Sequence, residues 1–157
     1  MRGDKKMKQT DAFDLRLAQE CANAFSGSTG LGCVVSDVNG KLFHESGYGC
    51  ASCRLCSVLK RQPDECIQAH IYGMTEAERF GGKYIYFCPM GLTCFVSPIL
   101  GPEGSEAKIT VGPFLMVDRQ DYVVWELTEQ MKLSEEEVEK VLTEMDSIPF
   151  VSPHTVT

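Results

Sequence analysis

One pair of residues, Asn39-Gly40, constrains the fold of this chain more than any other feature of its sequence. Asn-Gly fills the two central positions of a tight type I′ turn, which joins antiparallel strands. Apolar runs rich in β-formers lie on both sides of the pair, at 31–37 and 41–46. The pattern therefore predicts a β-hairpin and, with it, an antiparallel sheet.

The order of the other elements indicates the fold class. Apolar residues at helical spacing predict a helix over 11–26, ended by the Ser- and Gly-rich stretch 26–30, and a second helix follows the hairpin. Strand-like runs come next at 83–88, 92–100 and 107–117. We therefore expect an α+β domain, with a five-stranded antiparallel sheet and helices on one face and at its ends.

The two ends of the chain differ from its centre. Residues 1–11 are basic and are expected to be flexible, whereas 119–146 are predicted to form amphipathic helices. Ser134 stands three residues before Glu137, which is the capping-box pattern of a helix start. Residues 147–157 contain two prolines without periodicity and are expected to form a linker.

Composition excludes several classes of protein. The 157 residues, 43% of them hydrophobic, suffice for one globular domain with its own core. A net charge of −7 argues against direct binding to nucleic acid, which requires clustered Lys and Arg. The longest apolar runs fall short of the ~20 residues that span a bilayer, and the start lacks a signal-peptide pattern. We expect a cytoplasmic protein without a membrane partner. The glycines lack the strand–loop–helix context of a nucleotide-binding loop.

The cysteines are the main candidates for chemistry. The chain has eight, and three of them, Cys50, Cys53 and Cys56, lie in the short run CASCRLC. Thiolates are ligands for zinc and for iron–sulfur clusters, and a spacing of three residues lets neighbouring sulfurs converge. Cys66 and Cys88 follow further along the chain. The alternatives are a redox-active thiol group or small core residues, because free cysteine is among the most buried residue types.

Several longer motifs resemble the PocR-type ligand-binding domain, a branch of the PAS-like sensory domains. They are FSGSTGLGCVVSDVNGKLF, CRLC with the later Cys66, YIYFCPMGLTCFVSPI and ITVGPFLM, which together span roughly 12–118. The resemblance implies a sensory domain that binds a small organic molecule. Such domains precede AraC-type DNA-binding modules or histidine kinases, so DNA would be contacted only through a separate output module after 147–157.

The resemblance also selects the metal candidates among the cysteines. Positions that match Cys53, Cys66 and Cys88 are usually cysteine in this family, and Cys56 would add a fourth sulfur. The implied cofactor is zinc or an iron–sulfur cluster, with Cys50 as a spare ligand. His70 lies one helical turn after Cys66 and could replace a sulfur, line the pocket, or simply be a hydrogen-bonded core residue.

Pocket residues follow partly from strand alternation and partly from the resemblance. Tyr84 and Tyr86 lie on one side of their strand, where they could line a pocket or pack at the sheet edge. Gly91 is expected to form a tight turn or to give a ligand access to the backbone. In PAS-like domains the ligand lies between the sheet and the connecting helices. The resemblance places three further residues there: Phe25, Thr29 and Phe43.

The expected function is therefore ligand sensing without catalysis. The input would be a small, hydrocarbon-derived molecule, and the helices beside the sheet are expected to support a homodimer. Two alternatives remain: an iron–sulfur or thiol redox sensor, and a thiol oxidoreductase. The last would need a base beside an activated cysteine, and no local pattern supplies one.

Overall fold

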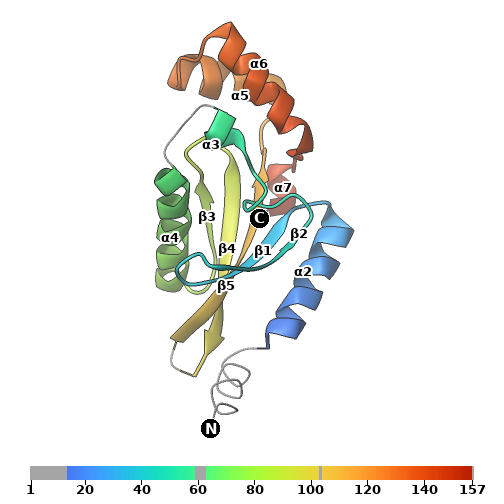
Figure 1. The fold of residues 1–157 in the computed structure, drawn as a ribbon, viewed down its shortest axis with the longest axis vertical. Helices are drawn as coiled ribbons and strands as arrows, with labels where there is room; N and C mark the ends of the chain where they lie inside the picture. Colours follow the sequence, from blue (N-terminus) through green and yellow to red (C-terminus); the bar gives the residue numbers. More distant parts are fainter. Residues whose placement is uncertain (1–13, 59–62, 103, 157) are drawn as a thin grey trace.

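A single antiparallel sheet with helices on both faces forms the body of the protein (Figure 1). The computed structural model describes residues 14–58, 63–102 and 104–156, so the expected flexible end at 1–11 lies outside the described residues. The five strands have the order β2-β1-β5-β4-β3. This α+β architecture is PAS-like and confirms the predicted fold class.

The predicted hairpin is present as β1 (Cys33–Asp37) and β2 (Leu42–Ser46), which pair antiparallel. The Asp37 carboxylate accepts hydrogen bonds from the backbone N–H groups of Asn39 (2.9 Å) and Lys41 (2.8 Å). Gly40 has a φ of 98°, a backbone conformation that glycine adopts readily. Local turn chemistry therefore sets the first two strands.

The other three strands are β3 (Tyr84–Phe87), β4 (Thr93–Gly101) and β5 (Gly104–Phe114). The last strand, β5, lies in the centre of the sheet, between β1 and β4. Its residues are therefore covered by strands on both edges and by helices on both faces. Four side chains in the middle of β5 are accordingly buried, those of Ala107, Lys108, Thr110 and Val111.

The first helix, α2 (Leu15–Thr29), packs on the face that carries Cys33, Val35 and Val111. It runs through the Ser- and Gly-rich stretch that was expected to end it, and stops only where Gly30 takes a left-handed conformation. The hydroxyls of Ser28 and Thr29 donate to helix carbonyls one turn earlier, at 2.5 and 2.7 Å. Gly30 ends the helix by donating its N–H to the Ser26 carbonyl (2.8 Å).

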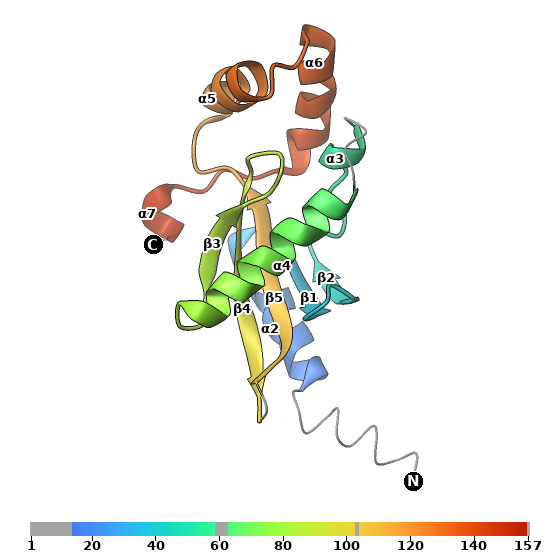
Figure 2. The same cartoon turned by 90° about the vertical axis from the view of Figure 1, so that its left-hand side faces the viewer.

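The second long helix, α4 (Pro63–Arg79), packs on the opposite face, against Tyr86, Cys94 and Val96 (Figure 2). The expectation that helices cover one face is therefore wrong. Local periodicity shows that a helix has an apolar side, but it does not show which face of the sheet that side meets.

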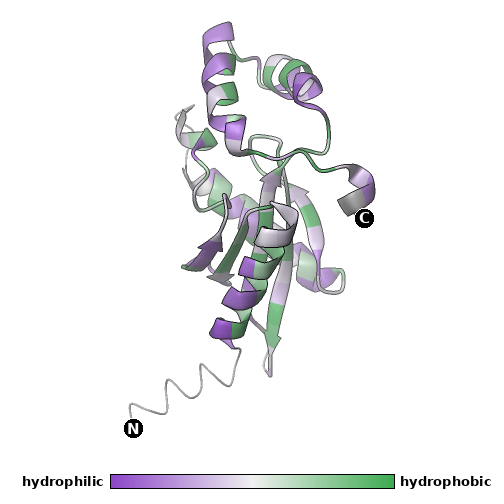
Figure 3. Cartoon of the chain, turned by 90° about the vertical axis from the view of Figure 1, so that its right-hand side faces the viewer, coloured by the Kyte–Doolittle hydropathy of each residue, from purple (hydrophilic) through white to green (hydrophobic). Residues whose placement is uncertain are grey.

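A third layer lies at one end of the sheet. It contains the short α3 (Leu55–Val58) and a C-terminal group of helices. That group consists of α5 (Arg119–Tyr122), the π-helical η1 (Val123–Gln130), α6 (Glu135–Glu144) and η2 (Met145–Ser147). The last helix, α7 (Pro153–Val156), lies apart from this group, beside the sheet (Figure 2). The predicted capping box of Ser134 and Glu137 opens α6. Figure 3 shows hydrophilic and hydrophobic residues alternating along these helices, as on α2.

The chain after α6 returns to the end of the sheet. Leu115 donates its N–H to the Pro149 carbonyl (2.9 Å) and accepts from the Val151 N–H (2.7 Å). The segment 147–157, expected as a linker, thus begins with backbone bonds to the strand end.

Candidate ligand and metal site

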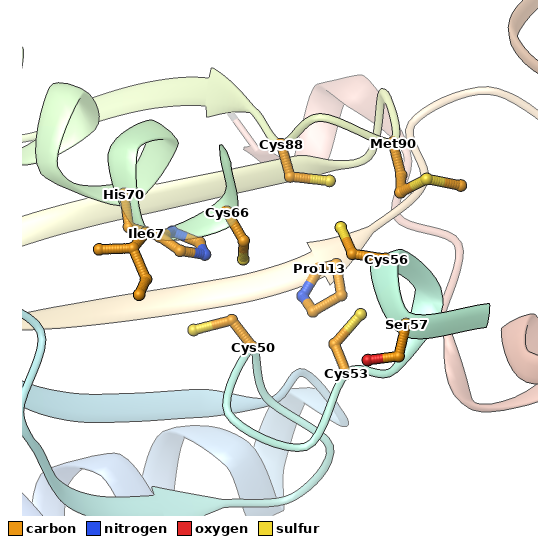
Figure 4. A pocket seen from close by; sticks show the side chains of 10 residues that line it. All are labelled: Cys50, Cys53, Cys56, Ser57, Cys66, Ile67, His70, Cys88, Met90 and Pro113. Carbon is orange, nitrogen blue, oxygen red and sulfur yellow. The ribbon is translucent and has the colours of Figure 1, made fainter. Parts of the chain in front are cut away.

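A cavity of about 220 Å³ opens between α4, α3 and the end of the sheet, and cysteines dominate its wall (Figure 4). Its lining includes five of them: Cys50, Cys53, Cys56, Cys66 and Cys88. The structure has no disulfide among the eight cysteines, all of which lie in the described residues. The four residues predicted as metal ligands therefore reach one cavity from three separate segments of the chain.

The loop that carries Cys50 and Cys53 is held by a single carboxylate. Glu45, on β2, accepts hydrogen bonds from the backbone N–H groups of Gly49 (3.0 Å) and Ser52 (2.9 Å) and from the Ser52 hydroxyl (2.6 Å). A carboxylate that accepts several hydrogen bonds fixes the loop geometry. Sequence analysis missed Glu45, because its partners lie in a loop without periodicity.

A tight turn between β3 and β4 positions Cys88. The Cys88 carbonyl accepts from the Gly91 N–H (2.9 Å), and the Cys88 N–H donates to the Leu92 carbonyl (2.9 Å). Gly91 has a φ of 76°, and a Cβ there would lie 2.6 Å from the Glu126 carboxylate. Pro89 and Gly91 thus occupy the positions that a type I turn followed by a left-handed residue requires. Gly91 shapes the turn, whereas its neighbour Met90 lines the cavity.

Burial controls the protonation of the cavity thiols. It raises the pKa of Cys50 and of Cys88 to about 12 and that of Cys66 to about 11, with smaller effects from neighbouring cysteines. The pKa of Cys53 is also raised by burial. A raised pKa keeps a thiol protonated at neutral pH, which is the opposite of an activated nucleophile.

The donor chemistry suits a soft metal, but the sulfurs are spread around the cavity. Thiolates bind zinc and iron–sulfur clusters. Within residues 14–58, 63–102 and 104–156, no three His, Cys, Asp or Glu side chains are arranged to hold one metal ion. Figure 4 shows the sulfurs distributed around the ring of Pro113. The wall therefore supplies the right ligand type without a preformed single-ion geometry.

His70 and Tyr86 form a buried pair beside the cysteines. The Tyr86 hydroxyl is hydrogen-bonded to Nδ1 of His70, and the two rings meet edge to face at 5.5 Å. Gly73 makes room for this contact, since a Cβ there would lie 2.5 Å from the tyrosine ring. Burial, aided by the charge of Lys108, lowers the pKa of His70 to about 4, so the imidazole is neutral at pH 7. Its second nitrogen, Nε2, is buried without a hydrogen-bond partner.

A second cavity of about 180 Å³ adjoins the first and shares four lining residues with it: Cys50, Cys66, Ile67 and His70. Its floor is the sheet, with Val34 and Ser36 from β1 and Lys108 and Thr110 from β5. Sequence analysis missed Lys108, which is only 2% exposed. A lysine inside an apolar strand could have indicated this site. However, strand alternation alone does not show that a helix covers the face of the sheet on which the lysine lies.

The structure separates the other predicted pocket residues from these cavities. Phe25 and Phe43 pack in the α2 cluster on the opposite face of the sheet, and Phe25 contacts Phe95 edge to face at 6.3 Å. Thr29 uses its hydroxyl to bond its own helix. Tyr84 shares the α4 face with Tyr86 but stacks on Phe80 at the other end of the helix. Of the predicted pocket residues, His70 lines both cavities.

One of three comparisons with known proteins identifies the family of this chain. No curated protein matches the chain. A solved structure, the inducer-binding domain of a double mutant of the PobR transcription factor from Acinetobacter in complex with 3-hydroxybenzoic acid, is similar at 12% identity and a TM-score of 0.36, over 83% of this chain and 95% of that one. Among the described residues, no helix has the length and apolarity needed to cross a membrane. The family model described as "Sensory domain found in PocR" matches residues 11–157, and the chain therefore belongs to the PocR sensory-domain family.

Proposed function

We propose that this chain is the ligand-sensing module of a transcriptional regulator or signalling kinase and has no catalytic activity of its own. Its ligand is a small, hydrocarbon-derived molecule that enters the paired cavities between α4 and the sheet. The observation that carries this proposal is a mainly apolar cavity with a few polar groups in a domain of a sensory family. Both cavities are smaller than the ~300 Å³ at the lower end for drug-sized ligands, which favours a small molecule.

The cavity wall offers a route from ligand to output. Met90 lines the cavity, and its carbonyl accepts a hydrogen bond of 2.6 Å from the buried Tyr122 hydroxyl. Tyr122 belongs to the C-terminal helices, where it packs in one cluster with Leu127 and Val141. A ligand that contacts Met90 differently in two states shifts their populations by its differential affinity. The C-terminal helices then change their packing with the wall of the cavity.

A thermal-shift screen tests this function. Ile67 lines both cavities from an exposed part of α4, so Ile67→Trp fills them at small cost to the fold, while Gln68→Trp on the exposed side of α4 is the matched control. We expect at least one compound from a panel of small alcohols, diols, amides and acids to raise the melting temperature of the wild type and of Gln68→Trp, but not of Ile67→Trp. A panel without any stabilising compound, or equal stabilisation of Ile67→Trp, contradicts the proposal.

A bound metal is the second element of the proposal. The residues that would hold zinc or an iron–sulfur cluster are Cys53, Cys56, Cys66 and Cys88. Zinc would stabilise the junction of the three segments, whereas a cluster would make the domain a redox sensor. The specific observation that favours this element is the gathering of five cysteines around one cavity. The raised pKa of these thiols makes the third alternative, a thiol oxidoreductase, the least supported.

Metal and sulfide analysis of protein purified without oxygen tests the metal site. Iron with sulfide and a broad absorbance near ~400 nm would identify a cluster, and zinc alone a structural ion. Cys66→Ser and Cys88→Ser should each lower the metal content, while Cys21→Ser, at an exposed site on α2, should leave it unchanged. Metal content that is zero in the wild type, or unaffected by the first two variants, contradicts the assignment.

The partners expected from the sequence complete the proposal. The module acts in the cytoplasm, where eight cysteines without a disulfide suit a reducing compartment, and reaches DNA only through a separate output module. A homodimer would form through α2 and the region of Trp125, which is 60% exposed. Sedimentation of the wild type and of Trp125→Glu tests this dimer, which should be present in the first and weakened in the second.

A further inference from the structure

Two buried polar atoms without hydrogen-bond partners line the smaller cavity. They are Nζ of Lys108 and Nε2 of His70. Lys108 rises from the sheet, and His70 descends from α4, so the two atoms approach the same space from opposite walls. Buried polar groups are nearly always paired in folded proteins, and each exception calls for an explanation.

The position of Lys108 keeps its ammonium group away from the protein surface. It lies on the central strand β5, with Ser36 of β1 and Pro98 of β4 as its cross-strand neighbours. Lysine usually extends its ammonium group to the surface, but here the whole residue is 2% exposed. An ammonium held in this way is strongly destabilising unless an anion joins it.

The acidic groups nearest Lys108 do not pair with its ammonium group. Asp37 and Cys50 both interact with its charge. However, Oδ1 of Asp37 already accepts two hydrogen bonds of the hairpin turn, from the backbone N–H groups of Asn39 and Lys41. Neither residue accepts a hydrogen bond from Nζ. Burial also lowers the pKa of Lys108, as expected for an ammonium without a counter-ion.

The tautomer of His70 makes it a second donor. A phenol is a better donor than acceptor, and the pKa of Tyr86 is raised by burial, so its hydroxyl keeps its proton and donates to Nδ1. A neutral imidazole that accepts at Nδ1 carries its proton on Nε2. The cavity therefore presents donors from two walls, one charged and one neutral, together with the hydroxyl-bearing residues Ser36 and Thr110.

We propose that Lys108 and His70 together bind the carboxylate of a small organic acid, whose hydrocarbon part lies along Val34, Leu42 and Ile67. This inference rests on the proposed ligand-sensing function and names the chemical class of the ligand. A carboxylate only accepts hydrogen bonds, so it complements two donors, and its single charge balances one ammonium beside a neutral imidazole. A dianionic phosphate would leave one charge unbalanced in a mainly apolar cavity.

The test compares ligands that share a shape and differ in charge. Butyrate, butyramide and 1-butanol are titrated into the full chain and followed by NMR, with the straight-chain acids from formate to hexanoate as a length series. We expect an acid of the series to bind at least about tenfold more tightly than its amide, because a charge-assisted hydrogen bond is lost in the amide. Lys108→Met should remove that preference, whereas Lys83→Met, at an exposed site, should keep it.

A stability measurement keeps the test independent of any one ligand. Because Lys108 is unpaired in the free protein, Lys108→Met should raise the melting temperature, by ~2 °C or more. If Lys108→Met does not fold, Lys108→Gln replaces it, and the affinities of the wild type for acid and amide still test the inference. Acids that bind no better than their amides, or an unchanged preference in Lys108→Met, overturn the inference and leave ligand sensing intact. Failure of every acid and of every neutral compound in the screen overturns both.

Discussion

Tyr122→Phe tests the hydrogen bond that ties the cavity wall to the C-terminal helices. Tyr122 is 1% exposed, and its hydroxyl donates to the carbonyl of Met90, itself 1% exposed, at 2.6 Å. Without the hydroxyl, that buried carbonyl loses this partner, and an unsatisfied buried polar group costs ~1–3 kcal/mol. Phenylalanine keeps the ring and its packing, so we expect the free energy of unfolding to fall by about 2 kcal/mol.

Urea unfolding, followed by circular dichroism, measures this loss. With a denaturant dependence of ~2 kcal/mol per molar urea, the midpoint should fall by about 1 M. Tyr72→Phe is the matched control, since Tyr72 is 55% exposed and its hydroxyl bonds Glu76 at 3.2 Å. It should change the free energy of unfolding by less than ~0.5 kcal/mol. Equal midpoints for the two variants would refute the reasoning, because the buried bond would then contribute no more than an exposed one.

Three further predictions concern packing, protonation and capping. Gly73→Ala should destabilise the protein by ~1–3 kcal/mol in urea unfolding, because its Cβ would lie 2.5 Å from the Tyr86 ring. Gly27→Ala is the control: open space surrounds this residue, so the substitution should stabilise the protein by ~0.5–1 kcal/mol. Changes of the same sign in both variants would be inconsistent with this packing. The pKa of His70 is lowered to about 4 in the folded state, so its stabilising contribution is complete above pH 6.5 and is lost as the pH falls through 4. Between pH 6.5 and 4, the free energy of unfolding of His70→Gln should therefore fall by about 3 kcal/mol less than that of the wild type. Parallel plots of this free energy against pH for the two proteins would contradict the prediction. Ser134→Ala removes the cap of α6 and should cost ~1 kcal/mol by the same assay, with no change if the capping box is absent in solution.

Local chemistry explains which parts of the fold could be predicted. The hairpin is indicated by Asn39-Gly40, because these residues favour tight turns between strands that are adjacent in sequence. The observed turn is not the two-residue type: it runs from Asp37 to Gly40, and the Gly40 N–H donates to the Asp37 carbonyl (3.1 Å). The capping box at Ser134 is equally local. The end of α2 was predicted too early because serine and glycine favour turns on average, whereas here the Ser28 and Thr29 hydroxyls bond carbonyls within the helix.

The residues of the site come together through tertiary packing, which no local sequence pattern determines. Cys66 and Cys88 were associated with the CASCRLC run by their ligand chemistry and by the family resemblance, and the structure brings these segments to one cavity. Phe25 was assigned to a pocket through the resemblance alone, because the sequence does not show which face of the sheet each helix covers. In the structure, α2 and α4 lie on opposite faces. Lys108 went unnoticed for the same reason, since its burial depends on α4 covering that side of β5.

The opposite placement of α2 and α4 has a further consequence for how this protein tolerates change. The sheet separates two clusters of buried residues: the α2 cluster around Val35 and Phe114 shares no residue with the α4 cluster around Tyr86 and Val96. Substitutions at sites without shared partners usually add in their effects on stability. Mutations in the α2 cluster can therefore raise or lower the stability of the domain without altering the residues that surround a ligand on the α4 side. The chain can diversify its specificity on one side while the other side maintains the fold.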